Sequence, residues 1–364
     1  MMLSDLELKY YSRQILLEEI GLKGQEKLKS AKVLVIGAGG LGCPVLTYLA
    51  AAGVGDIGIV DNDTIDISNL HRQILYSYEE IGKSKAEIAK IKLEKLNPFI
   101  SIEAFKLRLG IDNALEIIKK YDIIVDCSDN YQTRFLVNDA AIFLNKILVY
   151  GSIYKFEGQV SVFNFKNGPT YRCLFPQFPL KESLVNCSLS GVIGVLPGII
   201  GSFQANEVVK IITEQNNILS GKLMIYNAKT NNSQFIYFEK NSSINYDEII
   251  KLHFSNEIQY SETSKKELLE LEKIMKQEIL FLDVREIGEM PTFDFENLLK
   301  IPLSIVEMEF SKIPKNKKVI VFCQSGNRSK QAIILLEKFY NFENLVNLTD
   351  GISENFIESW KKKK

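Results

Sequence analysis

The sequence predicts an α/β protein built on a doubly wound parallel sheet, with a second, smaller α/β domain behind it. Short β-branched runs alternate with helix-like apolar stretches, beginning with the strand Lys32–Ile36 and the helix Leu41–Ala52. A similar alternation returns near the C-terminus after a polar interval. At 364 residues the chain is also long enough for two compact units of unequal size.

Further strands and helices continue the first alternation. Because crossover helices join parallel strands and cover the sheet, we expect helices on both faces. The expected elements are the strands Asp56–Val60, Ser101–Phe105, Asp122–Asp126 and Ile147–Tyr150 and the helices Ser84–Leu96, Asn113–Lys120 and Arg134–Phe143. The pattern then changes to two strands, Val160–Phe165 and Lys222–Tyr226, and one long apolar helix, Gly191–Ile212.

The domain boundaries follow from a change in composition. Residues 241–264 are polar, rich in Asn and Ser, and weakly periodic, which is typical of a linker. We therefore expect a first domain over residues 1–240 and a second over residues 265–364. The elements expected in the second domain are the strands Ile279–Val284, Lys318–Phe322 and Asn344–Leu348, the helix Arg328–Phe339 and a terminal helix.

Bulk composition excludes several classes of protein. The apolar fraction of 46% and the charged fraction of 24% are those of a globular protein. A formal net charge of −1 offers no general attraction for nucleic acid or an anionic membrane. The N-terminus lacks a signal-peptide pattern, no stretch is long and apolar enough to span a bilayer, and five irregularly spaced cysteines do not suggest a disulfide framework. We expect a cytoplasmic protein with neither nucleic acid nor membrane as a partner.

A glycine-rich turn indicates a nucleotide site. Gly37, Gly39 and Gly42 fit G-x-G-x-x-G at the point where a strand is expected to turn into a helix. There, backbone N–H groups and the helix dipole can bind phosphate oxygens. Asp61 follows the next strand, where its carboxylate can accept both ribose hydroxyls. These features alone describe a dehydrogenase equally well.

The segment Asp61–Gln73 is densely polar where a dinucleotide site would enter its next helix. Asn69, Arg72 and Gln73, joined by Lys85, can form a cationic cradle for a triphosphate, since Arg makes bidentate phosphate contacts and Lys supplies a point charge. The alternative is a solvated loop with charges on a helix face, which is the commoner fate of a lone lysine such as Lys85. As a group, these residues favour ATP over NAD.

Asp129 and Asn130 follow another strand, in the sequence CSDN. A carboxylate at this edge of the sheet can hold the Mg²⁺ that neutralises phosphate charge. The alternative role is to cap the helix that begins near Tyr131, and the two roles are compatible.

The motifs GAGGLG, DNDTIDISNLHRQ, GKSKAE and CSDN together resemble the ThiF/MoeB family, the bacterial relatives of ubiquitin-activating enzymes, from about Leu6 to Glu239. The resemblance implies a Rossmann-like fold, Mg²⁺ at Asp129 and a homodimer in which Arg13 reaches the phosphates of the neighbouring subunit's ATP. It implies adenylation of a ubiquitin-like sulfur carrier ending in Gly-Gly. The expected nucleotide site comprises Gly37, Gly39, Gly40, Gly42, Asp61, Asp63, Ser68, Asn69, Leu70, His71, Arg72, Gln73, Lys85, Asp129 and Asn130.

Two cysteines of the first domain bear on the chemistry. Cys187 lies in an irregular segment before an apolar helix, which suits a reactive thiolate, although a buried thiol is commoner. In similar proteins this position is the candidate for a thioester or persulfide link to the carrier. Most of the family binds a structural zinc through two Cys-x-x-Cys pairs, but here Thr170 replaces one ligand beside Cys173 and the second pair is missing. We expect no zinc and a structural role for Cys173.

The segment Cys323–Ser329 follows a β-branched strand and opens a helix, so backbone N–H groups can stabilise a thiolate or persulfide. With Leu282–Glu286 before it, this resembles the rhodanese domain over Lys265–Lys364, which implies a persulfide on Cys323 and a loop-stabilising role for Arg328. Phosphatase loops have a similar shape, but fusion to an activating domain favours sulfur transfer. Pro291–Glu296 can be a shortened family loop.

The sequence therefore predicts ATP-dependent adenylation of a sulfur carrier, followed by sulfur transfer from Cys323 to give a thiocarboxylate. The carrier can belong to molybdopterin, thiamine, cysteine or tRNA thiolation, and the fused architecture favours the molybdopterin type. The sulfur would come from a donor such as a cysteine desulfurase. The alternatives are a tRNA-modifying adenylating enzyme of the same fold, a carrier-docking scaffold without catalysis, and an NAD-dependent oxidoreductase, which leaves Arg72, Lys85 and Asp129 unexplained.

Overall fold

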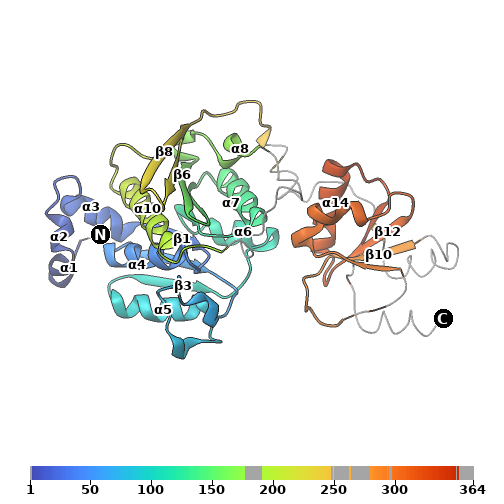
Figure 1. Ribbon diagram of the computed structural model, residues 1–364, viewed down its shortest axis with the longest axis horizontal. Coiled ribbons are helices and arrows are strands. Elements are labelled where there is room, and N and C mark those ends of the chain that lie inside the picture. Colours follow the sequence, from blue (N-terminus) through green and yellow to red (C-terminus); the bar gives the residue numbers. More distant parts are fainter. Residues whose placement is uncertain are drawn as a thin grey trace. The chain divides into compact units, whose positions relative to one another are not determined.

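The computed structural model describes residues 2–176, 191–246, 249, 262–263, 279–292, 294, 297–349 and 351. The chain divides into two compact units, Met1–Asn245 and Tyr246–Lys364, which are described separately (Figure 1). None of the helices in these ranges is both long and apolar enough to cross a membrane.

The first unit is an eight-stranded mixed sheet in the order β3-β2-β1-β4-β5-β6-β7-β8. The strands up to β5 are parallel and the remaining pairs are antiparallel. The expected doubly wound α/β fold is therefore confirmed. The strands are β1 (Lys32–Ile36), β2 (Asp56–Val60), β3 (Ser101–Phe105), β4 (Ile123–Asp126), β5 (Ile147–Tyr154), β6 (Glu157–Phe163), β7 (Lys222–Asn227) and β8 (Asn232–Tyr237).

Helices pack on this sheet in two groups. In the first group α4 packs against α5 and α10, and in the second α6 packs against α7 (Figure 1). The long helices are α4 (Gly42–Ala52), α5 (Lys85–Leu96), α6 (Ile111–Ile118), α7 (Tyr131–Phe143) and α10 (Val195–Ile212), with the short α8 (Tyr171–Leu174) after β6. Apolar side chains of β1, β2 and α4, such as Val33, Ile57 and Leu46, are fully or almost fully buried between these layers, and their burial drives the packing.

Three N-terminal helices that the sequence did not reveal lie at one end of this unit. They are α1 (Asp5–Tyr10), α2 (Ser12–Ile15) and α3 (Gly21–Ser30). Tyr11 fixes them to the sheet domain, because its hydroxyl accepts a hydrogen bond from Asn97 Nδ2 at 2.8 Å. Its ring lies 2.6 Å from where a Cβ on Gly53 would stand, so only glycine fits there.

The structure corrects several expected boundaries. β5 continues to Tyr154 instead of ending at Tyr150, because it forms a hairpin with β6 in which Tyr154 pairs with Glu157. α10 begins at Val195 and not at Gly191, whose φ of +66° is left-handed and cannot start a helix. β8 was missed because every side chain in it is exposed, so no alternation of buried residues marks it.

The second unit is a five-stranded parallel sheet in the order β11-β10-β12-β13-β9. Its elements are β9 (Glu262–Thr263), β10 (Ile279–Asp283), β11 (Leu298–Lys300), α13 (Val306–Glu309), β12 (Lys318–Phe322), α14 (Asn327–Tyr340) and β13 (Leu345–Leu348). β9 lies in the range expected to be linker, yet it pairs with β13, so the second sheet begins earlier than predicted. The expected terminal helix lies outside the described residues.

Candidate functional site

The glycine turn after β1 is fixed by close backbone packing. Gly37 has φ +94°, and a Cβ on it would stand 2.8 Å from the carbonyl oxygen of Cys127. A Cβ on Gly42 would stand 2.0 Å from the carbonyl oxygen of Gly37. The hydroxyl of Tyr76 donates to the carbonyl of Ala38 at 2.7 Å and holds the turn against the start of α5. These contacts hold the turn in its shape without a ligand.

Asp61, at the end of β2, is built into the same turn. Its Oδ2 accepts the backbone N–H of Ala38 at 2.7 Å, and its Oδ1 accepts that of Asp63 at 2.8 Å. Burial raises the pKa of the Asp61 carboxyl, and the two backbone N–H groups partly oppose this. Each carboxylate oxygen keeps a lone pair, so Asp61 can still accept ribose hydroxyls.

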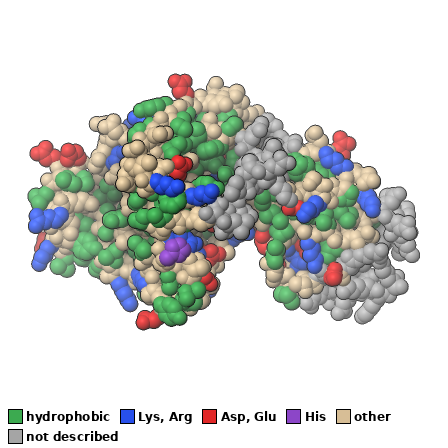
Figure 2. All heavy atoms as spheres, viewed as in Figure 1, with side chains coloured by type: hydrophobic (Ala, Val, Ile, Leu, Met, Phe, Trp, Pro, Cys, Tyr) green, Lys and Arg blue, Asp and Glu red, His purple; other side chains and the backbone are tan. Residues whose placement is uncertain are grey.

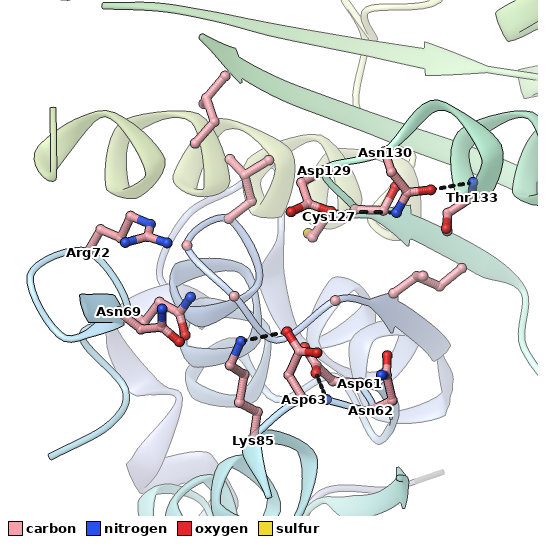
Figure 3. A pocket seen from close by; sticks show the side chains of 18 of the residues that line it. Asp61, Asn62, Asp63, Asn69, Arg72, Lys85, Cys127, Asp129, Asn130 and Thr133 are labelled. Carbon is pink, nitrogen blue, oxygen red and sulfur yellow. Dashed lines mark hydrogen bonds and ion pairs between the residues drawn. The ribbon is translucent and has the colours of Figure 1, made fainter. Parts of the chain in front are cut away.

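Asn69, Arg72 and Lys85 lie on the same side of the cleft, with Asp63 beside Lys85 (Figure 3). The Arg72 guanidinium donates from Nη1 to the carbonyl of Ser68 at 2.9 Å. Lys85 Nζ lies 2.9 Å from Asp63 Oδ2, and the Lys85 side chain is only 6% exposed, against 61% for Asp63. A lysine this deeply buried requires a negative partner, so Lys85 is not the solvated helix-face charge that the sequence left open.

Asp129 and Asn130 lie across the cleft, between β4 and α7 (Figure 3). The sequence left two roles open for this pair, helix cap and Mg²⁺ ligand, and each role fits a different residue. Asn130 is the helix cap, because its Oδ1 accepts the backbone N–H of Thr133 at 2.9 Å. Asp129 is exposed in the cleft, and among the described residues its Oδ1 has only a long contact, 3.5 Å, with Asn130 Nδ2. An accessible carboxylate beside a phosphate site has the oxygen chemistry that Mg²⁺ prefers.

The cleft between these walls has a volume of about 1050 Å³, enough for a nucleoside triphosphate. Two residues of the expected nucleotide site do not line it: Gly42 packs within α4, and Leu70 packs on the core. Arg13, which is expected at the phosphates of a neighbouring subunit, is exposed on α2. Cys187 lies outside the described residues. The expected residues that do line the cleft are Gly37, Gly39, Gly40, Asp61, Asp63, Ser68, Asn69, His71, Arg72, Gln73, Lys85, Asp129 and Asn130.

The cleft also contains positively charged residues that sequence reasoning missed, namely Arg108, Arg134 and Lys155. Arg134 is buried beneath the Asp129 loop, where its Nη2 donates to the carbonyl of Ser128 at 3.2 Å. Its guanidinium carbon lies 5.5 Å from the ring centroids of both Tyr131 and Tyr150. The length of β5 is the signal that could have identified Lys155, because a strand that ended at Tyr150 would leave this lysine away from the site.

Hydrogen bonds secure the corner around Cys173. Cys173 Sγ accepts the backbone N–H of Thr170 and of Asn241, both at 3.3 Å. Lys240 Nζ donates to the side-chain oxygen of Asn167 at 2.6 Å. Among the residues that the structure describes, no three His, Cys, Asp or Glu side chains gather as metal ligands.

In the second unit, Cys323 follows β12 and its side chain is completely buried. The hydroxyl of Ser329 donates to Cys323 Sγ at 3.5 Å. Gly326, at φ +84°, lets the loop turn into α14. Arg328 forms a bidentate ion pair with Glu289, with 2.8 Å between Nη2 and Oε2. This pairing lowers the pKa of Glu289 and raises that of Arg328.

A second arginine stiffens the strand end beside this loop. Arg285 donates from Nη2 to Asp283 Oδ2 at 2.6 Å and from Nε to Asp283 Oδ1 at 2.9 Å. Its Nη1 also donates to the carbonyl of Pro291 at 3.0 Å. The suggested shortened loop, Pro291–Glu296, lies partly outside the described residues.

Comparison with known proteins agrees with both halves of this description. Residues 11–245 match the ThiF family, and residues 266–357 match the rhodanese-like domain. A "Sulfur carrier protein adenylyltransferase" of Thermus thermophilus is 50% identical over 227 residues, which cover 61% of this chain and 84% of that protein. A "Probable molybdopterin-synthase adenylyltransferase" of Pyropia yezoensis is 43% identical and covers 96% of this chain and 93% of its own length.

Two further matches complete the comparison. The "Probable adenylyltransferase/sulfurtransferase MoeZ" of Mycobacterium tuberculosis is 36% identical, with 96% of this chain and 93% of that protein covered. The crystal structure of E. coli MccB with ATP superposes with a TM-score of 0.55 at 25% identity, covering 61% of this chain and 68% of MccB. The chain thus belongs to the ThiF family and carries a rhodanese-like domain behind its ThiF domain.

Proposed function

We propose that this protein uses Mg-ATP to adenylate the C-terminal glycine of a ubiquitin-like sulfur carrier and then delivers sulfur to it from Cys323. The relatives named as adenylyltransferases and sulfurtransferases support the two activities, and the molybdopterin-synthase name favours a carrier of that type. The observation that carries the proposal is the convergence of Asp61, the glycine turn, Lys85 and Asp129 on one cleft.

The order of the strands gives each group a place along a bound nucleotide. Asp61 follows β2, the glycine turn follows β1, and Asp129 follows β4, which are neighbours in the order β2-β1-β4. A ribose on Asp61 would leave the phosphates over the glycine turn, with Arg72 and Lys85 at their charges.

The reaction needs alignment and charge neutralisation more than acid–base chemistry. The carrier's terminal carboxylate attacks the α-phosphate, and pyrophosphate leaves. Asp129, with Asn130 beside it, would hold Mg²⁺, which neutralises phosphate charge when bound. Arg72 and Lys85 would stabilise the departing pyrophosphate.

We also propose that the protein acts as a homodimer. Leu6 and Leu22 on the N-terminal helices, with Leu16 and Leu17 between α2 and α3, are 53% to 72% exposed. Apolar side chains are visible among the charged ones on this end of the molecule (Figure 2). An apolar surface of this kind is typical of a protein interface. Arg13 lies on the same helices, which supports a role at the partner's phosphates.

Sulfur transfer would follow adenylation. The terminal sulfur of a Cys323 persulfide attacks the acyl carbon and displaces AMP, and cleavage of the remaining S–S bond by a thiol leaves the thiocarboxylate. Cys187 is the candidate for that thiol, and a cysteine desulfurase is a suitable source of the persulfide. We place this chemistry in the cytoplasm, since Cys43, Cys127, Cys173 and Cys323 are free thiols.

Carrier-dependent ATP–pyrophosphate exchange tests the adenylation step. We expect one of the organism's Gly-Gly carriers to support exchange with the wild type, and Asp129→Asn to reduce it by about 100-fold or more. Glu116→Gln, on the exposed surface of α6 and outside the cleft, is the matched control and should be unaffected. Failure of every carrier would refute the proposal and leave a tRNA-modifying enzyme or a docking scaffold.

A further inference from the structure

The tip of the β5–β6 hairpin overhangs the cleft. β4 ends at Asp126, which pairs with Tyr150, but β5 continues to Tyr154. At about 3.3 Å per strand residue, the hairpin extends about 13 Å beyond the edge from which the Asp129 loop emerges. Tyr154 and Lys155 at this tip line the cleft.

Lys155 is held in place through its backbone. It forms a bridge with Val192, and its carbonyl accepts the backbone N–H of Ile193 at 3.2 Å. Its ammonium lies 5.1 Å from the centroid of the Tyr154 ring. Among the described residues no carboxylate forms an ion pair with Lys155, so the cleft carries a positioned cation whose charge is not neutralised there.

The location of Lys155 separates it from the phosphate-binding cations. Along the sheet order β2-β1-β4-β5, Asp61 and the glycine turn, the residues proposed to bind ribose and phosphates, come first, then Asp129, then the hairpin with Lys155. Arg72 and Lys85 belong to the segments that follow β2, at the other end of this series. A carboxylate that attacks the α-phosphate has to enter from the side away from the departing pyrophosphate, which is the side of Lys155.

We propose that Lys155 binds the terminal carboxylate of the acyl substrate and positions it for attack. This inference rests on the proposed function, because it assumes that a carboxylate is the group adenylated. A lysine ammonium offers three hydrogen-bond donors and a charge that a glycine carboxylate matches.

The surroundings of Lys155 favour a protein tail over a free amino acid. Tyr154, Phe156, Ile193 and Val195 near the hairpin are large apolar residues that are 36% to 59% exposed. An extended tail ending in Gly-Gly can pass over this apolar rim while its carboxylate reaches the ammonium.

Lys166 provides a matched control. Like Lys155 it is a lysine in the left-handed region, with φ +50° against +53°. Its ammonium lies 5.3 Å from the centroid of the preceding ring, that of Phe165. It does not line the cleft, so the two lysines share local conformation and differ in location.

Equilibrium binding separates the carboxylate contact from catalysis. The probe is a molybdopterin-synthase small subunit ending in Gly-Gly, prepared with a terminal carboxylate and with a terminal amide. We expect the wild type and Lys166→Gln to bind the carboxylate form about tenfold more tightly than the amide form. Lys155→Gln should bind both forms alike, and Lys155→Arg should keep most of the preference.

Exchange kinetics with the carboxylate form supply a second readout. Lys155→Gln should raise the KM for the carrier by about tenfold and leave the KM for ATP within about twofold. Full retention of the carboxylate preference in Lys155→Gln would overturn the inference, as would a wild type that binds neither form or does not distinguish them. A wild type that prefers the carboxylate but catalyses no exchange would instead overturn the proposed adenylation.

Discussion

The nucleotide cleft and the Cys323 loop are constructed in opposite ways. The cleft collects side chains from distant parts of the sequence, such as Asp61, Lys85 and Asp129, and its Asp129 carboxylate is open to solvent. The loop is a single local segment, Cys323–Ser329, and its sulfur is fully buried. The first arrangement suits the capture of a large charged ligand, whereas the second keeps one sulfur atom away from water.

This difference has a consequence for sulfur transfer. Because Cys323 is fully buried, we expect the loop region to open before a persulfide on it can meet an acyl adenylate. The Arg328–Glu289 ion pair ties the loop to the segment after β10 and is the contact that such an opening would strain. The cleft needs no such step before ATP binds.

The largest expected effect separates the two regions completely. Cys323→Ser should abolish thiocarboxylate formation, because serine cannot carry a persulfide, while ATP–pyrophosphate exchange stays within about twofold of the wild type. Mass spectrometry of the carrier after incubation with ATP, a cysteine desulfurase and cysteine measures the first activity. Thiocarboxylate formation by Cys323→Ser at the wild-type rate would show that sulfur reaches the carrier by another route.

A smaller effect tests the buried cation of the cleft. Lys85→Met should reduce exchange by about 100-fold, because a positive charge near the transferring phosphates is lost. Lys92→Met is the control: Lys92 lies on the same helix, pairs with Glu80 at 2.7 Å and does not line the cleft. Equal losses of exchange in both variants would mean that α5 is being destabilised and that Lys85 has no special role.

The loop was easier to predict from sequence than the cleft. Cys323 and Arg328 lie within one short segment, so neighbouring residues alone indicated the strand-to-helix turn and the stabilised thiolate, and the fusion to an activating domain favoured sulfur transfer over phosphatase chemistry. In the cleft, Gly37, Asp61 and Asp129 each follow a predicted parallel strand, and such strand ends meet at one edge of the sheet.

The residues that sequence reasoning missed depend on pairing between strands. Lys155 reaches the cleft only because pairing with β6 extends β5 beyond Tyr150. The strand β8 was missed for a related reason, since all its side chains are exposed and no alternation of buried residues marks it. Arg134 was expected only as the first residue of a helix, since nothing local indicates that its guanidinium lies under Ser128. Glu289 likewise meets Arg328 only in the folded domain.

The Glu289–Arg328 pair predicts a moderate, pH-dependent effect on the second unit. The Glu289 pKa is lowered, first of all by its hydrogen bonds to Arg328, so the pair stabilises the fold above the ordinary glutamate pKa of about 4.3. This stability is lost as the pH falls through the lower, folded-state value. Glu289→Gln should therefore reduce the free energy of unfolding by about 1 kcal/mol at pH 7, with the difference vanishing at acidic pH.

Chemical denaturation between pH 7 and pH 3 measures this difference. Glu343→Gln serves as the control, because Glu343 is exposed and forms no ion pair among the described residues. A difference between Glu289→Gln and the wild type that persists unchanged below pH 4 would show that the effect comes from packing and not from charge.

The smallest expected effect concerns the corner around Cys173. Cys173→Ser keeps an acceptor for the backbone N–H groups of Thr170 and Asn241, and Cys173→Ala exposes those groups to water that can replace the sulfur. Both variants should lower the free energy of unfolding by less than about 1 kcal/mol. Metal analysis of the purified wild type should find no stoichiometric zinc. If Cys173 were a zinc ligand, the wild type would instead retain about one zinc per chain and both variants would lose it together with several kcal/mol of stability, because binding of a structural zinc contributes directly to folding.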